Sequence, residues 1–164
     1  MEYIVRRVQQ KDNPQIANII RTVMPEFGAS GAGFAIHDSE VDDIFKAYSR
    51  ARTAYFVCEH NGKIVGGGGV APLEGGEAST CELKKMYFLS EGRGKGLGQK
   101  VLLSCIEAAR EIGFETCYLE TFNTMNTAMK LYEKNGFKKI PGQLGNTGHF
   151  ACDIFYQLKL GAKG

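Results

Sequence analysis

The stretch that decides the fold is 81-CELKKMYFLSEGRGKGLGQKVLLSCIEAAREIGF-114. It begins as a strand-like run, passes through four glycines and two cations at 92–98, and continues as an amphipathic segment at 97–112. Glycine inside a helix costs roughly 1 kcal/mol relative to alanine, so four of them at a helix start need a reason. The first amides of a helix lack internal partners and carry the positive end of its dipole, and glycine lets an anion approach them. The segment therefore predicts a phosphate-binding turn, in which Arg93 and Lys95 add charge that suits a pyrophosphate.

The spacing of this turn argues against the two commonest phosphate-binding loops. A Walker A loop needs Ser or Thr after its Gly-Lys pair, but Lys95 is followed by Gly96. A dinucleotide fingerprint that starts at Gly94 would need glycine where Gln99 stands. Taken alone, the segment could also be a flexible turn between a strand and a helix.

Composition and charge limit the class of protein. The chain has 164 residues, of which 43% are hydrophobic, and this is enough for one domain with its own core. The net charge of +2 is spread along the chain, so we expect no nucleic-acid partner. We find no apolar run of membrane-spanning length and no signal-peptide core, so we expect a cytoplasmic protein without a membrane partner. Five cysteines without a CxxC pair and three scattered histidines predict reduced thiols and no metal site.

Periodicity and turn residues predict eleven elements in the order βααβββαβαββ. The clearest local signal is the hairpin at 53–71, where Asn61-Gly62 joins two strand-like runs. The expected strands lie at 3–8, 53–60, 63–71, 81–89, 116–121, 137–140 and 150–160. The expected helices start at Asp12-Asn13-Pro14 and at Asp38-Ser39-Glu40, and cover 97–112 and 126–135. We expect one domain over residues 1–160, followed by a disordered tail at 161–164.

Two motifs together suggest a family for the glycine segment. Arg93-x-x-Gly96-x-Gly98 matches the Q/R-x-x-G-x-G/A pyrophosphate loop of the GNAT acetyltransferase superfamily, and AMKLYEKNGF at 128–137 resembles its closing motif, A-x-x-L-Y-x-x-x-G-F. The match at motif level covers about residues 81–137. The resemblance implies a GNAT-like α/β (α+β) fold, with a mixed, mostly antiparallel seven-stranded sheet and about four helices on its faces. It also implies that strands four and five splay apart and hold pantetheine between them.

The resemblance assigns the residues that bind acetyl-CoA. The end of strand four would pair with pantetheine, and the glycine loop would wrap the pyrophosphate. The residues so assigned are Met86, Tyr87, Phe88, Arg93, Gly94, Lys95, Gly96, Leu97, Gly98 and Gln99. The family often has an asparagine where this chain has Met125, and Asn123 or Asn126 is the expected replacement for its pantetheine contact.

Two residues are candidates for catalysis. Glu82 lies where family members with a carboxylate base on strand four place it, and strand alternation puts it on the same side as Lys84 and Met86. The alternative is an exposed glutamate paired with a lysine; Lys84 and Lys85 are expected to be solvated or paired with acids. Tyr132, in the closing motif, would stabilise or protonate the leaving thiolate, and the alternative is a tyrosine that only packs on the sheet.

Further expectations concern the residues that would bind the acceptor and the glycine run in the third strand. Glu26 and Phe27 follow the first helix, where the family builds its acceptor wall, although a helix-ending loop would explain them equally. His149 could line the acceptor pocket, act as a base near neutral pH, or lie in a surface loop. The glycine run at 66–69 falls within a strand and predicts a bulge or a close approach of backbones.

These expectations converge on an acetyl-CoA-dependent N-acetyltransferase without a metal. A primary amine, with small molecules favoured, would attack the thioester directly. The alternatives are a non-catalytic acyl-CoA sensor, an acetyltransferase of protein N-termini or lysines, and a nucleotide-phosphate protein. The sequence leaves a homodimer open.

Overall fold

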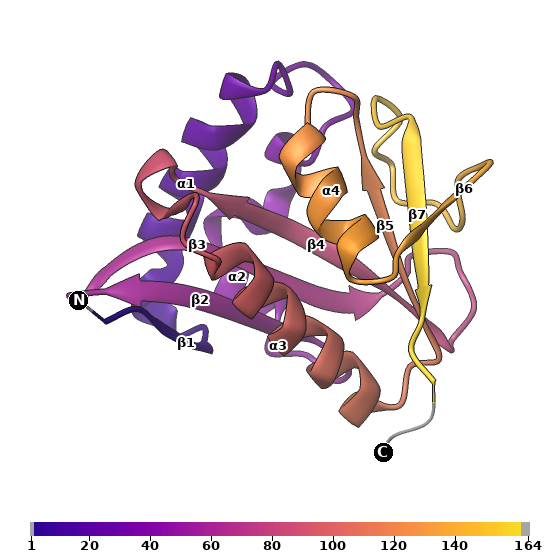
Figure 1. Cartoon of the computed structure of the whole chain (residues 1–164), viewed down its shortest axis with the longest axis horizontal. Coiled ribbons are helices and arrows are strands. Elements are labelled where there is room, and N and C mark those ends of the chain that lie inside the picture. The colour runs from indigo at the N-terminus through magenta and orange to yellow at the C-terminus, as the bar shows by residue number, and fades with distance from the viewer. Residues whose placement is uncertain (1, 162–164) are drawn as a thin grey trace.

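Seven strands form one mixed sheet in the computed structural model of the protein, which describes residues 2–161 (Figure 1). The sheet order is β1-β2-β3-β4-β5-β7-β6, and every pair of neighbours is antiparallel except β4 and β5. The strands are β1 (Ile4–Arg7), β2 (Ala54–His60), β3 (Lys63–Pro72), β4 (Thr80–Phe88), β5 (Thr116–Thr121), β6 (Lys138–Ile140) and β7 (Ile154–Lys159). The α-helices are α1 (Asn13–Glu26), α2 (Ile44–Ala47), α3 (Leu97–Ile112) and α4 (Asn126–Lys134).

This architecture confirms the expected fold and element order. The hairpin lies where Asn61-Gly62 predicted it, and both turn residues have positive φ, at 51° and 79°. This backbone matches the twist of the two flanking strands, which is why Asn-Gly is preferred there. Helix α3 has the predicted bounds, and it begins and ends next to left-handed glycines, Gly96 and Gly113. Left-handed residues at both ends stop the helix from extending in either direction.

Helices cover both faces of the sheet, and each face has its own core. Helices α3 and α4 pack on one face, where Leu102, Cys105 and Tyr132 are buried (Figure 1). Helices α1 and α2 pack on the other face, with Ile20 and Ile44 in its core. None of the helices within residues 2–161 is both long and apolar enough to cross a membrane. The five cysteines are free thiols, and all but Cys152 are buried.

One expectation about the elements needs correction, and another lies almost entirely outside the described residues. The second helix does not begin at Asp38: residues 39–42 form a 3-10 turn, and α2 starts only at Ile44. Asp43 is its N-cap and accepts a hydrogen bond from the Lys46 amide, whereas the Asp38 side chain is used elsewhere. The predicted tail at 161–164 falls almost entirely on residues 162–164, which lie outside the described part of the chain.

Strand β4 contains a bulge that the alternation argument missed. The pairing of β3 with β4 shifts between Gly67 and Gly69, and Lys85 has a φ of 52°. A bulge inserts one extra residue, so side chains beyond it change face. Met86 therefore packs with the core under α3, whereas Glu82, whose strand partner is Ala71, lies on the opposite face. The prediction that Glu82 and Met86 share a side was wrong.

The glycine run in β3 is explained by close packing on both sides, as predicted. A Cβ on Gly66 would lie 2.1 Å from Cδ1 of Phe88, and a Cβ on Gly67 would lie 2.7 Å from the Phe56 carbonyl oxygen. The strand thus has no room for side chains beside the bulge of β4. These contacts fix the backbone that carries the site.

Strands β4 and β5 separate partway along their length. They pair only at Thr80–Thr116, Cys81–Cys117 and Glu82–Tyr118, although β4 continues along β3 to Phe88. Beyond Glu82, no other strand within residues 2–161 pairs with β4 on its β5 side. The result is a fork in the sheet whose vertex lies at Glu82.

Candidate active site

A small cavity of about 50 Å³ lies at the fork between β4 and β5. The strands contribute residues 82–87 and 119–121, and Met24, Met125, Tyr132 and His149 complete the lining with other side chains from the helices and the 149–152 loop. The cavity joins polar groups from segments that are far apart in the sequence. It is therefore the natural place to look for chemistry.

Glu82 is a buried carboxylate that faces this cavity. Its side chain comes from the vertex of the fork, and the residue is only 4% exposed. Within residues 2–161 we find no hydrogen-bond or ion-pair partner for its carboxylate. Every fully enclosed side-chain oxygen in this part of the chain has a hydrogen-bond partner, so the Glu82 oxygens are not fully enclosed. Burial raises the pKa of Glu82 to about 7, although the positive charge of Lys84 opposes the shift. A carboxyl group of this kind can accept or release a proton near neutral pH.

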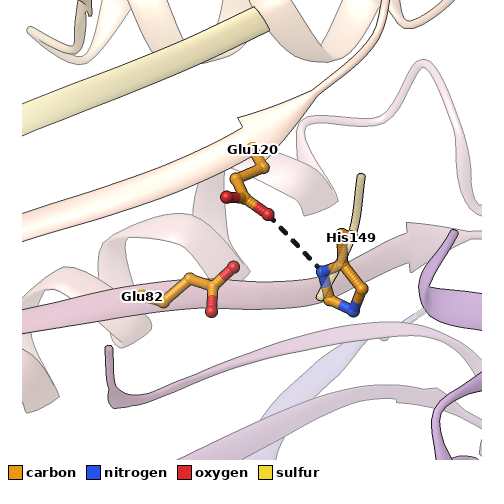
Figure 2. A group of neighbouring side chains, drawn as sticks. All are labelled: Glu82, Glu120 and His149. Carbon is orange, nitrogen blue, oxygen red and sulfur yellow. Dashed lines mark ion pairs between the residues drawn. The ribbon is translucent and has the colours of Figure 1, made fainter. Parts of the chain in front are cut away.

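A second carboxylate, Glu120 on β5, lies close to Glu82. It accepts hydrogen bonds from Thr147 (2.6 Å), Tyr118 (2.7 Å) and Gln143 (2.9 Å). Burial would raise the pKa of Glu120, but His149 and these donors outweigh it and lower the pKa. Figure 2 shows Glu82 and Glu120 on neighbouring strands, with the His149 ring beside them.

His149 lies between two carboxylates. Its Nε2 is 2.8 Å from Oδ2 of Asp38, and its Nδ1 is 3.5 Å from Oε1 of Glu120. Burial would lower the pKa of His149, but these two acids raise it from 6.5 to about 9. The residue is only 7% exposed, so the surface-loop alternative was wrong. An imidazolium at neutral pH is also a poor general base, which argues against that role.

Behind His149 lies a buried lysine. The Nζ of Lys85 is 2.6 Å from Oδ2 of Asp38 and 3.1 Å from Oε2 of Glu40. Lys84 is looser, with its Nζ 3.6 Å from Oε1 of Glu40. Both lysines are thus paired with acids rather than solvated. Asp38, which the sequence suggested as a helix start, instead joins the Lys85 ammonium to the imidazolium.

Glu82, Glu120 and His149 each offer a ligand atom, and these atoms lie within 4.8 Å of one another. That spacing alone would suit a metal ion. However, both nitrogens of His149 face carboxylates, and an imidazole in such a position keeps its protons instead of offering a lone pair. The arrangement therefore fits a network of ion pairs better than a metal centre.

Tyr132 reaches the same cavity from α4. Its ring packs against Phe137 and Tyr156 in the core. Among the described residues no hydrogen bond engages its hydroxyl, and the side chain lines the cavity. Burial raises the pKa of Tyr132 well above its usual value, so the phenol keeps its proton. The structure thus brings Tyr132 and Glu82 to one cavity.

The glycine loop lies between β4 and α3, as expected from the sequence. Gly94 and Gly96 have φ of 75° and 76°, and a Cβ on either would meet nothing within 4 Å. Leu97 is buried at the helix start, while Lys95 is exposed. The loop therefore presents accessible backbone next to the N-terminus of a long helix, which suits an anion.

The residues at the two ends of the loop also hold it in place. Arg93 donates from Nε to the Phe88 carbonyl (2.9 Å), and its guanidinium lies 3.1 Å from Glu26 and 5.3 Å from the Phe27 ring centre. Gln99 exchanges two hydrogen bonds with Asn135, of 2.9 and 2.7 Å. Gly98, within the first turn of α3, is close to Leu131 of α4.

Several predicted site residues lie away from the cavity. Glu26 and Phe27 contact Arg93 and do not line the cavity, so they lie beside the glycine loop. Asn123 and Asn126 are exposed, whereas Met125 lines the cavity.

Sequence reasoning missed Glu120 and Asp38. Glu120 could have been found, because it is the only acid in the buried run TCYLET, and strand alternation places it on the face of Tyr118. The parallel pairing of Glu82 with Tyr118 then brings it near Glu82. Nothing in the sequence around Asp38 distinguishes it from a helix cap.

Comparisons with known proteins agree with this geometry. The acetyltransferase (GNAT) family model matches residues 16–137. YjgM, an uncharacterized N-acetyltransferase of Escherichia coli (strain K12), is 47% identical over 152 residues, covering 92% of this chain and 91% of YjgM. A GNAT-family acetyltransferase structure from Staphylococcus aureus Mu50 has a TM-score of 0.83 at 20% identity, covering 98% of this chain and 100% of that one. The yncA protein of Salmonella typhimurium, solved with its cofactor acetyl-CoA, has a TM-score of 0.76 at 21% identity, covering 100% and 97%. The chain therefore belongs to the acetyltransferase (GNAT) family and is an acyltransferase.

Proposed function

We propose that this acyltransferase moves an acetyl group from acetyl-CoA to a primary amine, and that the acceptor is a small molecule. One observation carries the proposal: the Glu82 carboxylate and the Tyr132 hydroxyl, neither of which has a hydrogen-bond partner within residues 2–161, face one cavity at the fork of the sheet. A base and an acid on the two sides of a reacting centre suit acyl transfer.

The fork and the glycine loop supply a fitting place for the co-substrate. The backbone of β4 at Met86–Phe88 lies beyond the last pair with β5 and can accept an extended pantetheine arm. The open backbone at Gly94 and Gly96, with Arg93 and Lys95 beside it, offers space and positive charge to a pyrophosphate wrapped by residues 94–98. Binding of CoA and acetyl-CoA by related structures, as in yncA, supports this assignment.

The chain's residues then divide the proton transfers between them. Ionised Glu82 removes a proton from the ammonium form of the acceptor, directly or through a water, and the freed nitrogen lone pair then attacks the acetyl carbon. The carbon–sulfur bond breaks, and Tyr132 donates its proton to the departing thiolate. Backbone amides of β4 stabilise the oxyanion that forms on the carbonyl. The second nitrogen proton restores the Tyr132 phenol, and Glu82 releases its proton to solvent, so the products are the acetamide, the CoA thiol and one proton.

Thiol release from acetyl-CoA tests the proposal across a panel of amines. The panel holds polyamines, amino acids, amino sugars, a peptide with a free N-terminus and a lysine peptide. We expect release above the enzyme-free rate with one class of small amine. Tight acetyl-CoA binding without release for any amine would instead indicate a sensor, and equal binding of ATP and CoA would indicate a nucleotide-phosphate protein.

A further inference from the structure

The two carboxylates at the fork pose an electrostatic problem. Glu82 and Glu120 lie on adjacent strands, and each has an oxygen within 4.8 Å of the same His149. Two neighbouring carboxylates in a buried site repel, so that one of them holds a proton at neutral pH. A fixed cation beside them would weaken this repulsion.

We propose that His149, held as an imidazolium between Asp38 and Glu120, is a positioning residue that balances Glu120 and thereby leaves the neighbouring Glu82 free to ionise. The inference rests on the proposed function, in which Glu82 is the base. It gives His149 neither the role of base nor that of an acceptor ligand.

The position of His149 is fixed from several sides. Its backbone amide donates to Oγ1 of Thr147 (3.2 Å), and the Thr147 hydroxyl donates to Glu120 (2.6 Å). Its backbone carbonyl accepts from the Cys152 amide (3.1 Å), and its Nε2 contacts Asp38. The imidazolium therefore cannot swing into solvent without breaking its contacts to Asp38 and Glu120.

The surrounding charges leave His149 as the cation that directly contacts Glu120. Lys85 is held by Asp38 and Glu40, and Lys84 lies nearest to Glu40. Lys84 also favours the ionised form of Glu82, and does so more strongly than His149.

The titratable and charged groups that face Glu82 and His149 are Lys84, Lys85 and Tyr87 on β4, Tyr118 and Glu120 on β5, Asp38, Glu40 and Tyr48 from the 38–48 segment, Tyr132 on α4, and Cys152.

Carbon-13 NMR of glutamate side chains tests the inference without an acceptor. The Glu82 carboxyl signal is identified by its loss in Glu82→Gln and then titrated in the other variants. We expect a midpoint near 7 in the wild type. In His149→Gln it should rise by roughly one unit or more, the usual effect of losing an opposite charge at this range. His149→Lys, which keeps a cation, should restore at least half of the change.

A matched control distinguishes the loss of the His149 charge from a disturbance of the loop that carries it. Phe150 follows His149 in the same loop, is 77% exposed and packs on Gly33 without a charge. Phe150→Ala should leave the Glu82 midpoint within about 0.3 units of the wild type. An unchanged midpoint in folded His149→Gln, or an equal rise in Phe150→Ala, would overturn the inference.

Two further measurements keep the inference testable. If His149→Gln does not fold, nitrogen-15 NMR of the wild-type imidazole decides: an imidazolium at pH 7 supports the proposal, and a neutral ring overturns it. If Glu82→Gln keeps the wild-type dependence of kcat/KM on pH, the proposed base is wrong, while the NMR midpoints still report whether His149 controls Glu82. The two failures are thus distinguishable.

Discussion

Glu82 and Glu120 are the same type of residue in two different environments. Glu82 is buried, has no hydrogen-bond or ion-pair partner in the described part of the chain and has a pKa raised to about 7, while hydrogen-bond donors and His149 lower the pKa of Glu120. Environments that separate the pKa values of two neighbouring titratable groups mark acid–base roles in enzymes. At neutral pH Glu120 is therefore a fixed anion, and Glu82 is the carboxyl group that can exchange a proton.

Glu82→Gln removes the proposed base but keeps the shape of the side chain. We expect kcat/KM at pH 7 to fall roughly 10²-fold or more, in the range for a lost general base. The loss should shrink at high pH, where the amine deprotonates unaided. The wild-type kcat/KM should decline as the pH falls below about 7, because the raised pKa makes Glu82 protonated there. If Glu82→Gln keeps this decline of kcat/KM at acidic pH, another group is the base. As a control, calorimetry should find the same acetyl-CoA affinity in the variant and the wild type.

Tyr132→Phe keeps the ring packing and deletes the acidic proton. We expect a stable protein with acetyl-CoA affinity within a few fold and a kcat lower by roughly 10²–10³, as for a lost general acid. Tyr156→Phe is the matched control, because its ring packs against Tyr132 but its hydroxyl donates to Glu133. An undiminished kcat in Tyr132→Phe, with chemistry shown to be rate-limiting, would leave Tyr132 a packing residue.

At the scale of elements, the turn from β4 into α3 combines an open backbone with a helix start. Gly94 and Gly96 adopt left-handed φ values that other residues rarely adopt. Arg93 ties the turn to the end of β4 and to Glu26 at the end of α1. The turn is therefore held by its flanks while its centre stays accessible.

Gly96→Asp should put a side chain and a negative charge where a pyrophosphate would bind. We expect CoA affinity to fall at least about tenfold, a loss of about 1.4 kcal/mol, while the fold survives. Gly96→Asn carries similar backbone strain without the charge and should lose less. Gly62→Asp places the same residue at a left-handed glycine in the β2–β3 turn and should bind CoA normally. Equal CoA affinity in wild type and folded Gly96→Asp, measured by calorimetry, would rule out this loop as the pyrophosphate site.

The glycines of β3 allow the strands beside the fork to pack closely. In Gly67→Ala, the new Cβ would lie 2.7 Å from the Phe56 carbonyl oxygen and 2.9 Å from the Tyr55 ring. The backbone oxygen belongs to a paired strand and cannot move away cheaply. We expect urea denaturation to show a loss of about 1–3 kcal/mol in the free energy of unfolding. Gly31→Ala, at an open loop position, should change it by less than about 0.5 kcal/mol, and a similar small change in Gly67→Ala would contradict the packing argument.

At the scale of the whole molecule, ion pairs join segments that are far apart in the sequence. Asp38 precedes α2 and His149 precedes β7, and they are 111 positions apart in the sequence. Lys85 on β4 and Glu120 on β5 extend the contact to both arms of the fork. The ion pairs therefore join the segments that carry Asp38 and His149 to strands β4 and β5.

This network should make stability depend on pH through His149. Because folding raises the pKa of His149 from 6.5 to about 9, its stabilising effect is fully present below pH 6.5 and is lost as the pH rises through 9. We expect His149→Gln to lower the free energy of unfolding by on the order of 2 kcal/mol at pH 6, and by much less at pH 9.5. Urea denaturation of both proteins at the two pH values measures the difference. The same destabilisation at both pH values would show that the His149 charge does not stabilise the fold.

Much of the fold could be predicted because its signals are local. Asn61-Gly62 prefers the left-handed turn of a hairpin, and the apolar spacing of 97–112 matches the helical period, so the bounds of α3 were predicted correctly. Tyr132, suggested by the closing motif, and Glu82, suggested by the family resemblance, both line the cavity. The glycine run at 66–69 predicted a bulge or a close approach in β3, but not that the extra residue lies in β4 at Lys85, because this depends on how β3 packs against β4.

The sequence alone determined the element order, the glycine turn at the start of α3 and the family resemblance, since each depends on residues close together in the chain. Only the tertiary structure decided which charges meet at the fork. Asp38, Glu120 and His149 come from three separate segments, and their contacts depend on strand register and loop paths. The pKa of a buried group is set by neighbours within a few ångströms, whatever their distance along the chain. The tertiary structure therefore raises the pKa of Glu82 to about 7 through burial, and the contacts of His149 with Asp38 and Glu120 raise its pKa to about 9.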